Sequence, residues 1–194
     1  MKFGYYTFLL LLVLSQFSCK QNKRKLETAW KTVVWLDTKE NESYQSIHID
    51  SLYFSEIDSV SKAAMGYVVT FVGNECWWAN DDETAIEERS NLKCTILNAL
   101  DLGCQCSDRH LTYLRKWFQY DEKVLKELED CPTIPYTSTI QTTIKELRIL
   151  RLPTEIVIKT KEAQINTRED YYQEYSKNYL FSYINNQLLL KKIY

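Results

Sequence analysis

The sequence predicts a single, disulfide-stapled α+β domain in which strands precede and follow a central helical segment and a β-hairpin closes the chain. Three observations predict this class. Apolar and polar residues alternate towards both ends of the chain, which is typical of half-buried strands. In the middle, apolar residues recur every third or fourth position, as on a helix face. Five cysteines follow residue 70, and the 194 residues, 45% of them apolar, suffice for one core.

The N-terminal part of the domain mixes strand and helix patterns. Segment 28–37 is rich in β-branched and aromatic residues, but its apolar spacing also fits a helix, so both assignments stay open. Segment 44–54 alternates locally and predicts a strand with a bulge. Residues 56–65 predict a short helix that Gly66 ends, because glycine tolerates a left-handed cap. Residues 67–72 then predict a buried strand.

A helical pattern covers residues 84–131. Leu92, Ile96 and Leu100 recur every fourth residue, and Gly103 stands at the expected C-cap.

Two shorter helices are predicted in the second half of this segment. Ser107 is a good N-cap for a helix that runs to about Phe118, and Asp121 caps a second helix. Cys131 and Pro132 end it, because proline disfavours helical geometry in the residue before it.

The C-terminal part is more β-like. Alternation over 156–160 predicts a strand, and a sequence that resembles a capping box predicts a polar helix near 168–177. Residues 179–184 and 188–194 flank Asn-Asn-Gln at 185–187, and asparagine tolerates positive φ, so a closing hairpin is expected.

Composition excludes several classes of function. The four glycines are too far apart for a dinucleotide fingerprint or a P-loop, and only two histidines are present. The formal net charge of −2 lacks the strong basic excess that is typical of nucleic-acid binding, and no cofactor is expected.

The first residues have the order of a secretory signal. Lys2 precedes an apolar run from Phe8 to Leu14, and a short segment leads to Ser18 and Cys19. Residues 16–19, Gln-Phe-Ser-Cys, resemble the lipobox of bacterial lipoproteins, in which a small residue precedes the cysteine that is acylated.

The resemblance implies a location. Cys19 would carry the lipid, including palmitate, and become the mature N-terminus, so that residues 1–18 are the signal peptide. Lys20, in place of the aspartate that favours inner-membrane retention, implies the outer membrane. Residues 19–26 then form a basic tether, and 27–194 form the domain. The alternative is a secreted soluble protein that is cut near Ser18.

In an oxidising compartment the remaining cysteines first predict disulfides. An antiparallel helical hairpin would bring Cys131 back to Cys104 and Cys106, so one of these two is expected to bond to it. Cys76 and Cys94 form a plausible second pair.

Two other kinds of site use the same residues. A tetrahedral zinc site would combine Cys104, Cys106, His110 and Cys131, and a C-x-C thiol pair would support redox catalysis. Neither is favoured over a structural disulfide in an oxidising compartment, and no metal is expected.

A second cluster centres on Trp77 and Trp78. An exposed indole there could stack on a sugar or anchor a protein interface, and the neighbouring carboxylates of Glu75, Asp81 and Asp82 raise the alternative of glycosidase chemistry. A solvated acidic loop, with both indoles in the core, explains the same residues and is favoured over catalysis.

His48, between two isoleucines, is expected to be a half-exposed structural histidine.

Together these features predict a non-enzymatic, lipid-anchored protein of the cell envelope that binds another macromolecule. One version is an immunity-type protein that captures a periplasmic toxin. The alternatives are a glycan-binding lipoprotein of an uptake system and a small envelope enzyme. The expected partners are the membrane, through the lipid, and a protein or a glycan, but no nucleic acid.

Overall fold

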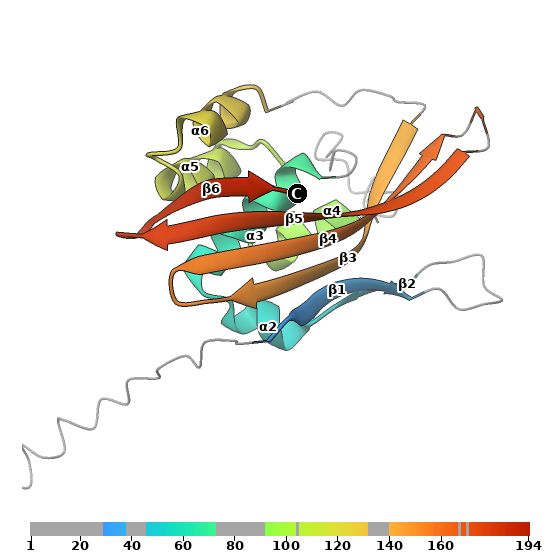
Figure 1. Ribbon diagram of the computed structural model, residues 1–194, viewed down its shortest axis with the longest axis horizontal. Coiled ribbons are helices and arrows are strands. Elements are labelled where there is room, and N and C mark those ends of the chain that lie inside the picture. Colours follow the sequence, from blue (N-terminus) through green and yellow to red (C-terminus); the bar gives the residue numbers. More distant parts are fainter. Residues whose placement is uncertain are drawn as a thin grey trace, which may run out of the picture.

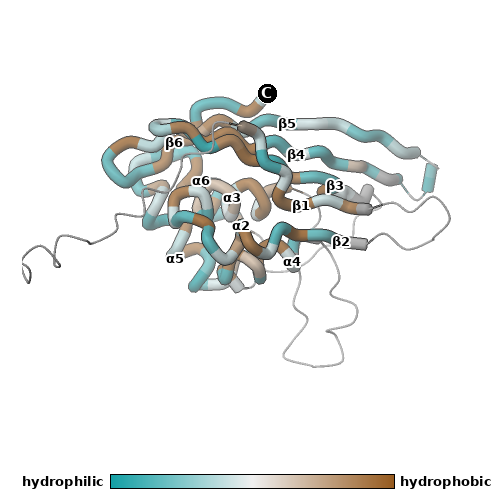
Figure 2. Tube along the Cα trace, turned by 90° about the horizontal axis from the view of Figure 1, so that it is seen from below, coloured by the Kyte–Doolittle hydropathy of each residue, from teal (hydrophilic) through white to brown (hydrophobic). Residues whose placement is uncertain are grey.

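The protein consists of a sheet and a layer of helices on one of its faces (Figures 1 and 2). The computed structural model describes residues 29–37, 46–72, 92–103, 105–131, 140–166, 168–169 and 171–194. Its six described strands form one antiparallel sheet in the order β2-β1-β3-β4-β5-β6. The prediction of an α+β fold with a disulfide is confirmed.

Strands lie at both ends of the described chain and helices lie between them, as expected. The strands are β1 (Lys31–Asp37), β2 (Ser46–Ile49), β3 (Ile140–Arg151), β4 (Glu155–Asn166), β5 (Tyr171–Ile184) and β6 (Gln187–Ile193). The helices are α2 (Ser51–Glu56), α3 (Ser59–Phe71), α4 (Leu92–Ala99), α5 (Asp108–Trp117) and α6 (Glu122–Glu129).

Helix α3 corrects the expectation of a strand at 67–72. It runs unbroken through Gly66 to Phe71, and nearly all of its residues from Val60 to Thr70 are buried. A helix that is buried on every side has apolar residues all round, so its sequence shows no amphipathic period. A short apolar run of this kind cannot be distinguished from a buried strand by periodicity. Asp58 begins the helix by accepting the N–H groups of Val60 and Ser61.

The strand expected over 44–54 is also shorter than predicted. Strand β2 ends at Ile49, and the Asp50 side chain accepts the Tyr53 N–H at 2.8 Å, which begins α2. Phe54 is therefore a buried residue of a helix and not of a strand. The open choice for 28–37 is resolved as a strand, β1.

Helix α4 ends at a residue other than the glycine that the sequence suggests. Asp101 takes the left-handed conformation (φ 51°), and its N–H bonds to the Asn98 carbonyl oxygen at 2.8 Å. The Leu102 N–H reaches back to the Leu97 carbonyl oxygen at 3.0 Å, which completes a Schellman motif. Gly103 also has positive φ, but it lies beyond this motif. Residues 84–91 lie outside the described residues.

The helices α5 and α6 confirm their predicted starts. The Ser107 hydroxyl oxygen accepts the His110 N–H at 3.3 Å, and an Asp121 carboxylate oxygen accepts the Val124 N–H at 3.2 Å.

The polar helix expected near 168–177 is wrong, because β5 begins at Tyr171 and pairs with β4 in continuous register from Asn166↔Tyr171 to Glu155↔Ser182. The interstrand hydrogen bonds of this long ladder outweigh a local capping signal, and the tyrosines of the segment favour a strand. The strand expected at 156–160 lies within β4 and is confirmed.

Strand β3 lies in a stretch over which the sequence pattern predicts no element. A bulge interrupts its pairing with β4 between Ile144 and Glu146. The bulge puts Ile144 and Leu147, three residues apart, on the same buried face and so breaks the period of two.

The closing hairpin is confirmed. Asn185 and Asn186 have φ of 52° and 61°, the backbone that a two-residue turn of type I′ needs, and β5 and β6 pair on either side of them. Gln187 is the first residue of β6.

The core lies between the sheet and α3. Tyr67 is its centre, since its ring lies 5.3 Å from the ring of Phe118 and 5.9 Å from that of Phe181. Its hydroxyl donates to the Glu127 carboxylate of α6, and burial, followed by this carboxylate, raises the Tyr67 pKa above its ordinary value. One side chain thus joins α3, the end of α5, α6 and the sheet.

Gly66 lets α3 approach the outer helices closely. A Cβ at this position would lie 2.6 Å from Leu102 Cδ1 and 3.3 Å from Leu114 Cδ2. Both leucines are buried, so they have little room to move. The absence of a side chain at residue 66 is therefore a packing requirement.

We predict that Gly66→Ala destabilises the protein. Helix propensity alone favours alanine by about 1 kcal/mol, and overpacking costs about 1–3 kcal/mol, so a net loss of about 1 kcal/mol is expected in urea denaturation. In a Leu102→Ala background the collision is relieved, and Gly66→Ala is expected to become neutral or stabilising. A stabilising effect in the wild-type protein would contradict the close approach.

Candidate functional site

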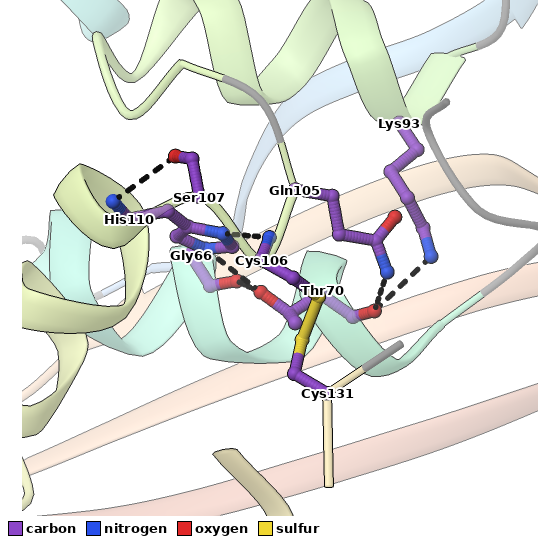
Figure 3. Close-up of a disulfide and its surroundings, with 8 residues drawn as sticks. All are labelled: Gly66, Thr70, Lys93, Gln105, Cys106, Ser107, His110 and Cys131. Atoms are coloured by element: carbon purple, nitrogen blue, oxygen red, sulfur yellow. Dashed lines mark hydrogen bonds between the residues drawn. A yellow bond between two sulfur atoms is a disulfide. The ribbon is translucent and has the colours of Figure 1, made fainter. Parts of the chain in front are cut away.

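The cysteine cluster that the sequence singles out contains one described disulfide, between Cys106 and Cys131 (Figure 3). It joins the start of α5 to the end of α6, with 5.8 Å between the Cα atoms and a sequence separation of 25. The expected bridge across the helical hairpin is confirmed, and the partner of Cys131 is Cys106. Closing a loop of this length stabilises the fold by about 3.5 kcal/mol in the chain-entropy model.

His110 lies beside this disulfide and is fully buried. Its Nδ1 accepts the Cys106 backbone N–H at 3.0 Å, so the ring proton is on Nε2. Nε2 lies 3.0 Å from Thr70 Oγ1, which donates its own proton to the Gly66 carbonyl oxygen at 2.6 Å. With His110 in the neutral Nε2–H tautomer, every donor and acceptor in this series of hydrogen bonds, from the Cys106 N–H to the Gly66 carbonyl oxygen, has a partner.

The same region caps the C-terminal end of α3. The Thr70 carbonyl oxygen accepts the Lys93 ammonium at 3.1 Å and the Gln105 amide at 3.0 Å (Figure 3). Lys93 is only 4% exposed, so its charge is held against the negative end of the helix dipole. Burial, followed by the nearby Lys93 charge, lowers the His110 pKa to about 4.

This arrangement suits a structural role. Cys106 and Cys131 are bonded to each other, and both ring nitrogens of His110 are hydrogen bonded, so three of the four residues of the zinc alternative are occupied in other ways. No group of three or more possible ligands for a metal ion occurs among the described residues.

We predict that His110 makes the protein less stable in acid. The unfolded histidine takes up a proton near pH 6.5, whereas the folded ring stays neutral to about pH 4. Between these values the unfolded state binds more protons, so this part of the stability is complete above pH 6.5. It is lost, by about 3 kcal/mol, as the pH falls to 4.

The test is urea denaturation as a function of pH. His110→Asn keeps a short polar side chain but cannot titrate in this window, so its unfolding free energy should fall less steeply than that of the wild type. Equal slopes would contradict the assignment. Nitrogen NMR of the ring should show Nε2–H above pH 5.

A second candidate site is the sheet face that no described helix covers, called the open face below (Figure 2). Trp30 and Trp35 lie on it and are 39% and 37% exposed. Trp35 stacks on His48 of the neighbouring strand, with ring centroids 5.4 Å apart. Tyr172 and Tyr194, 55% and 56% exposed, lie on the far strands of the same face.

Charged side chains surround these aromatic residues. Glu174 accepts the ammonium groups of Lys145 and Lys161, both at 2.7 Å, as well as the Tyr172 hydroxyl. The hydrogen bonds from the two lysines lower the Glu174 pKa to about 2. Nearer to β1, the Arg148 guanidinium lies 5.9 Å from the Trp30 ring centroid, within cation–π distance.

A shallow groove of about 560 Å³ lies between α3 and α5. Its polar side chains contact one another, since Arg109 pairs with Asp101 at 2.6 Å and Lys62 lies over the Tyr113 ring. The open face, whose aromatic residues are exposed, is therefore the stronger candidate for binding.

Several predicted site residues lie outside the described residues. These are Cys19, Glu75, Cys76, Trp77, Trp78, Asp81, Asp82 and Cys104. Cys94 lies in α4, but its side chain is not among those described. His48 is half-buried on β2, as expected. Trp30 and Trp35 were not among the predicted site residues, although they lie in a segment rich in aromatic residues. Only the sheet order shows which face the described helices leave open.

Comparisons with other proteins add no functional assignment. No helix among the described residues is long and apolar enough to cross a membrane. The chain matches no protein-family model, no curated protein and no solved structure.

Proposed function

We propose that this protein is a non-enzymatic, lipid-anchored protein of the cell envelope, with its lipid on Cys19 in the outer membrane. In this proposal residues 27–194 act as one disulfide-stapled domain that binds another macromolecule through the open face. The support for the anchor is the signal-like segment and its lipobox-like end.

The observation that carries the binding role is the aromatic content of the open face. Trp30, Trp35, Tyr172 and Tyr194 are each more than a third exposed on one face of the sheet. Tryptophan and tyrosine are enriched at the hot spots of protein interfaces, because one side chain buries a large area at low entropy cost. The partner that fits this proposal best is a protein, and the concrete version is a toxin that an immunity-type protein captures in the periplasm.

A glycan is the second candidate partner. Trp35, which stacks on His48, presents a flat aromatic surface of the kind on which sugar rings stack. In that version the protein is a glycan-binding lipoprotein of an uptake system.

The anchor is tested with Cys19→Ala. Radiolabelled palmitate is expected to label the wild-type protein and not the variant, and the variant should leave the detergent phase for the aqueous phase, since several acyl chains are needed for stable anchoring. The control is Tyr120→Ala, at an exposed position far from residue 19 in the sequence, which should still be labelled. Labelling of Cys19→Ala would exclude this anchor.

The binding role is tested by complementation of a deletion strain. Cells that lack the protein are expected to become sensitive to neighbouring or kin bacteria, and a Trp30→Ala/Trp35→Ala variant should not restore resistance. Tyr120→Ala, which removes a 71%-exposed aromatic residue next to α6, should restore it.

The immunity version fails if the deletion causes no sensitivity. The open face is excluded if the double tryptophan variant protects as well as the wild type. Glycan-array binding that disappears in the same variant would favour the glycan version.

A further inference from the structure

The open face has an uneven distribution of charge. Side chains that alternate onto it from β3 to β6 include five cations, Lys145, Arg148, Lys159, Lys161 and Lys192, and three carboxylates, Glu146, Glu155 and Glu174. From β3 to β6 the face therefore has an excess of two cations, although the whole chain has a formal charge of −2.

The excess is concentrated in one row across the sheet. Arg148 and Lys159 are directly opposite each other in the register of β3 and β4. The row continues through Thr32 on one side and Asn178 on the other, and none of these four side chains is a carboxylate. Like charges in directly opposed positions destabilise a sheet. This row, called the basic row below, is thus a local cost to the fold.

The cations of the basic row are poorly compensated within the chain. Arg148 Nε lies 3.6 Å from a Glu146 carboxylate oxygen, which is too far for a hydrogen bond. The same nitrogen is buried and has no hydrogen-bond partner in the described part of the chain. Lys159 has no ion-pair partner among the described residues, whereas Lys145 and Lys161 share Glu174.

An apolar row lies next to the basic row. Leu150 pairs with Val157, and Val157 pairs with Leu180, on the same face. Val157 is 8% exposed and the two leucines are half-buried. Trp30 lies close to both rows, because its ring contacts Arg148 and it precedes Lys31, which pairs with Ile149.

We propose that the open face binds an acidic segment of a partner protein, whose carboxylates pair with Arg148 and Lys159 and whose apolar side chain packs between Trp30 and the apolar row. This inference rests on the proposed function and names the chemistry of the partner. A like-charge pair across two strands destabilises the unbound fold, and such unfavourable pairs are expected at functional sites, where the charges of a partner offset the repulsion. Complementary charge accelerates association and fixes the register of the partner.

The pattern favours a polypeptide over the other anionic partners. Glu146, Glu155 and Glu174 lie on the same face, and they would repel an anionic lipid surface or a polyphosphate that covered it. A polypeptide can place carboxylates over the basic row alone. A neutral glycan would offer Lys159 no ion-pair partner.

The experiment measures binding of a fluorescent synthetic peptide to the full-length protein in detergent. The peptide carries glutamates on both sides of one leucine, and the control peptide has glutamine at each glutamate. The glutamate peptide is expected to bind the wild type, to bind it less tightly at high salt, and to bind at least about fivefold more tightly than the glutamine peptide.

Arg148→Glu and Lys159→Gln test the basic row, and Lys123→Glu is the control. Arg148→Glu is expected to raise the Kd about five- to tenfold. Lys123→Glu, the same kind of charge reversal on the exposed surface of α6, should leave the Kd within twofold of the wild-type value. Lys159→Gln is expected to weaken binding and also to raise the urea midpoint of the unbound protein, because it removes a like-charge pair. If Lys159 had a purely structural role, its replacement would lower the urea midpoint of the unbound protein as well as the affinity for the peptide.

The proposal is overturned if the two peptides bind equally, if neither binds, or if Arg148→Glu leaves the Kd unchanged. It is also overturned if vesicles that contain phosphatidylglycerol bind through the basic row and the glutamate peptide does not, since the occupant is then a membrane surface. The proposed function is tested separately, by the complementation assay: binding through the open face is excluded if the Trp30→Ala/Trp35→Ala variant protects as well as the wild type.

Discussion

The packing of α3 against the sheet is the constraint on which the rest of the structure depends. One face of the sheet is apolar along β3, β4 and β5, and it must be buried to stabilise the fold. Helix α3 covers it and is itself covered by α4 and α5, so nearly every side of this helix faces protein. Gly66 allows this double burial, because a side chain there would collide with Leu102. Tyr67, the next residue, closes the core from the same helix.

The disulfide and His110 serve this same packing. The Cys106–Cys131 bond holds α5 and α6 as a hairpin over α3, and the neutral His110 ring links the start of α5 to Thr70 near the end of α3. Lys93 and Gln105 complete the link at the Thr70 carbonyl oxygen. The disulfide, His110, Lys93 and Gln105 thus hold the helices α3, α4, α5 and α6 together.

Local signals predicted much of the fold, and long-range packing decided the remainder. Ser107, Asp121 and the Asn185–Asn186 turn act within four residues, and each was found where the sequence indicated. The elements that were predicted wrongly depend on distant partners. Residues 67–71 are helical because the helix that they continue packs between the sheet and the outer helices, and 171–177 form a strand because β4 lies beside them. The candidate binding surface was missed for the same reason: the exposure of Trp30 and Trp35 depends on which face α3 covers.

The face that stabilises the fold and the face proposed to bind a partner are therefore opposite faces of one sheet. Core packing, the disulfide and the capped helices lie on one side, and exposed aromatic residues with a like-charge pair lie on the other. The most direct test places a photo-crosslinking amino acid in living cells at Ser176, on the open face, or at Thr112, on the outer surface of α5. Binding through the open face predicts one discrete protein adduct at Ser176, which Arg148→Glu abolishes, and none at Thr112. An adduct at Thr112 alone, or one at Ser176 that Arg148→Glu leaves unchanged, would contradict it.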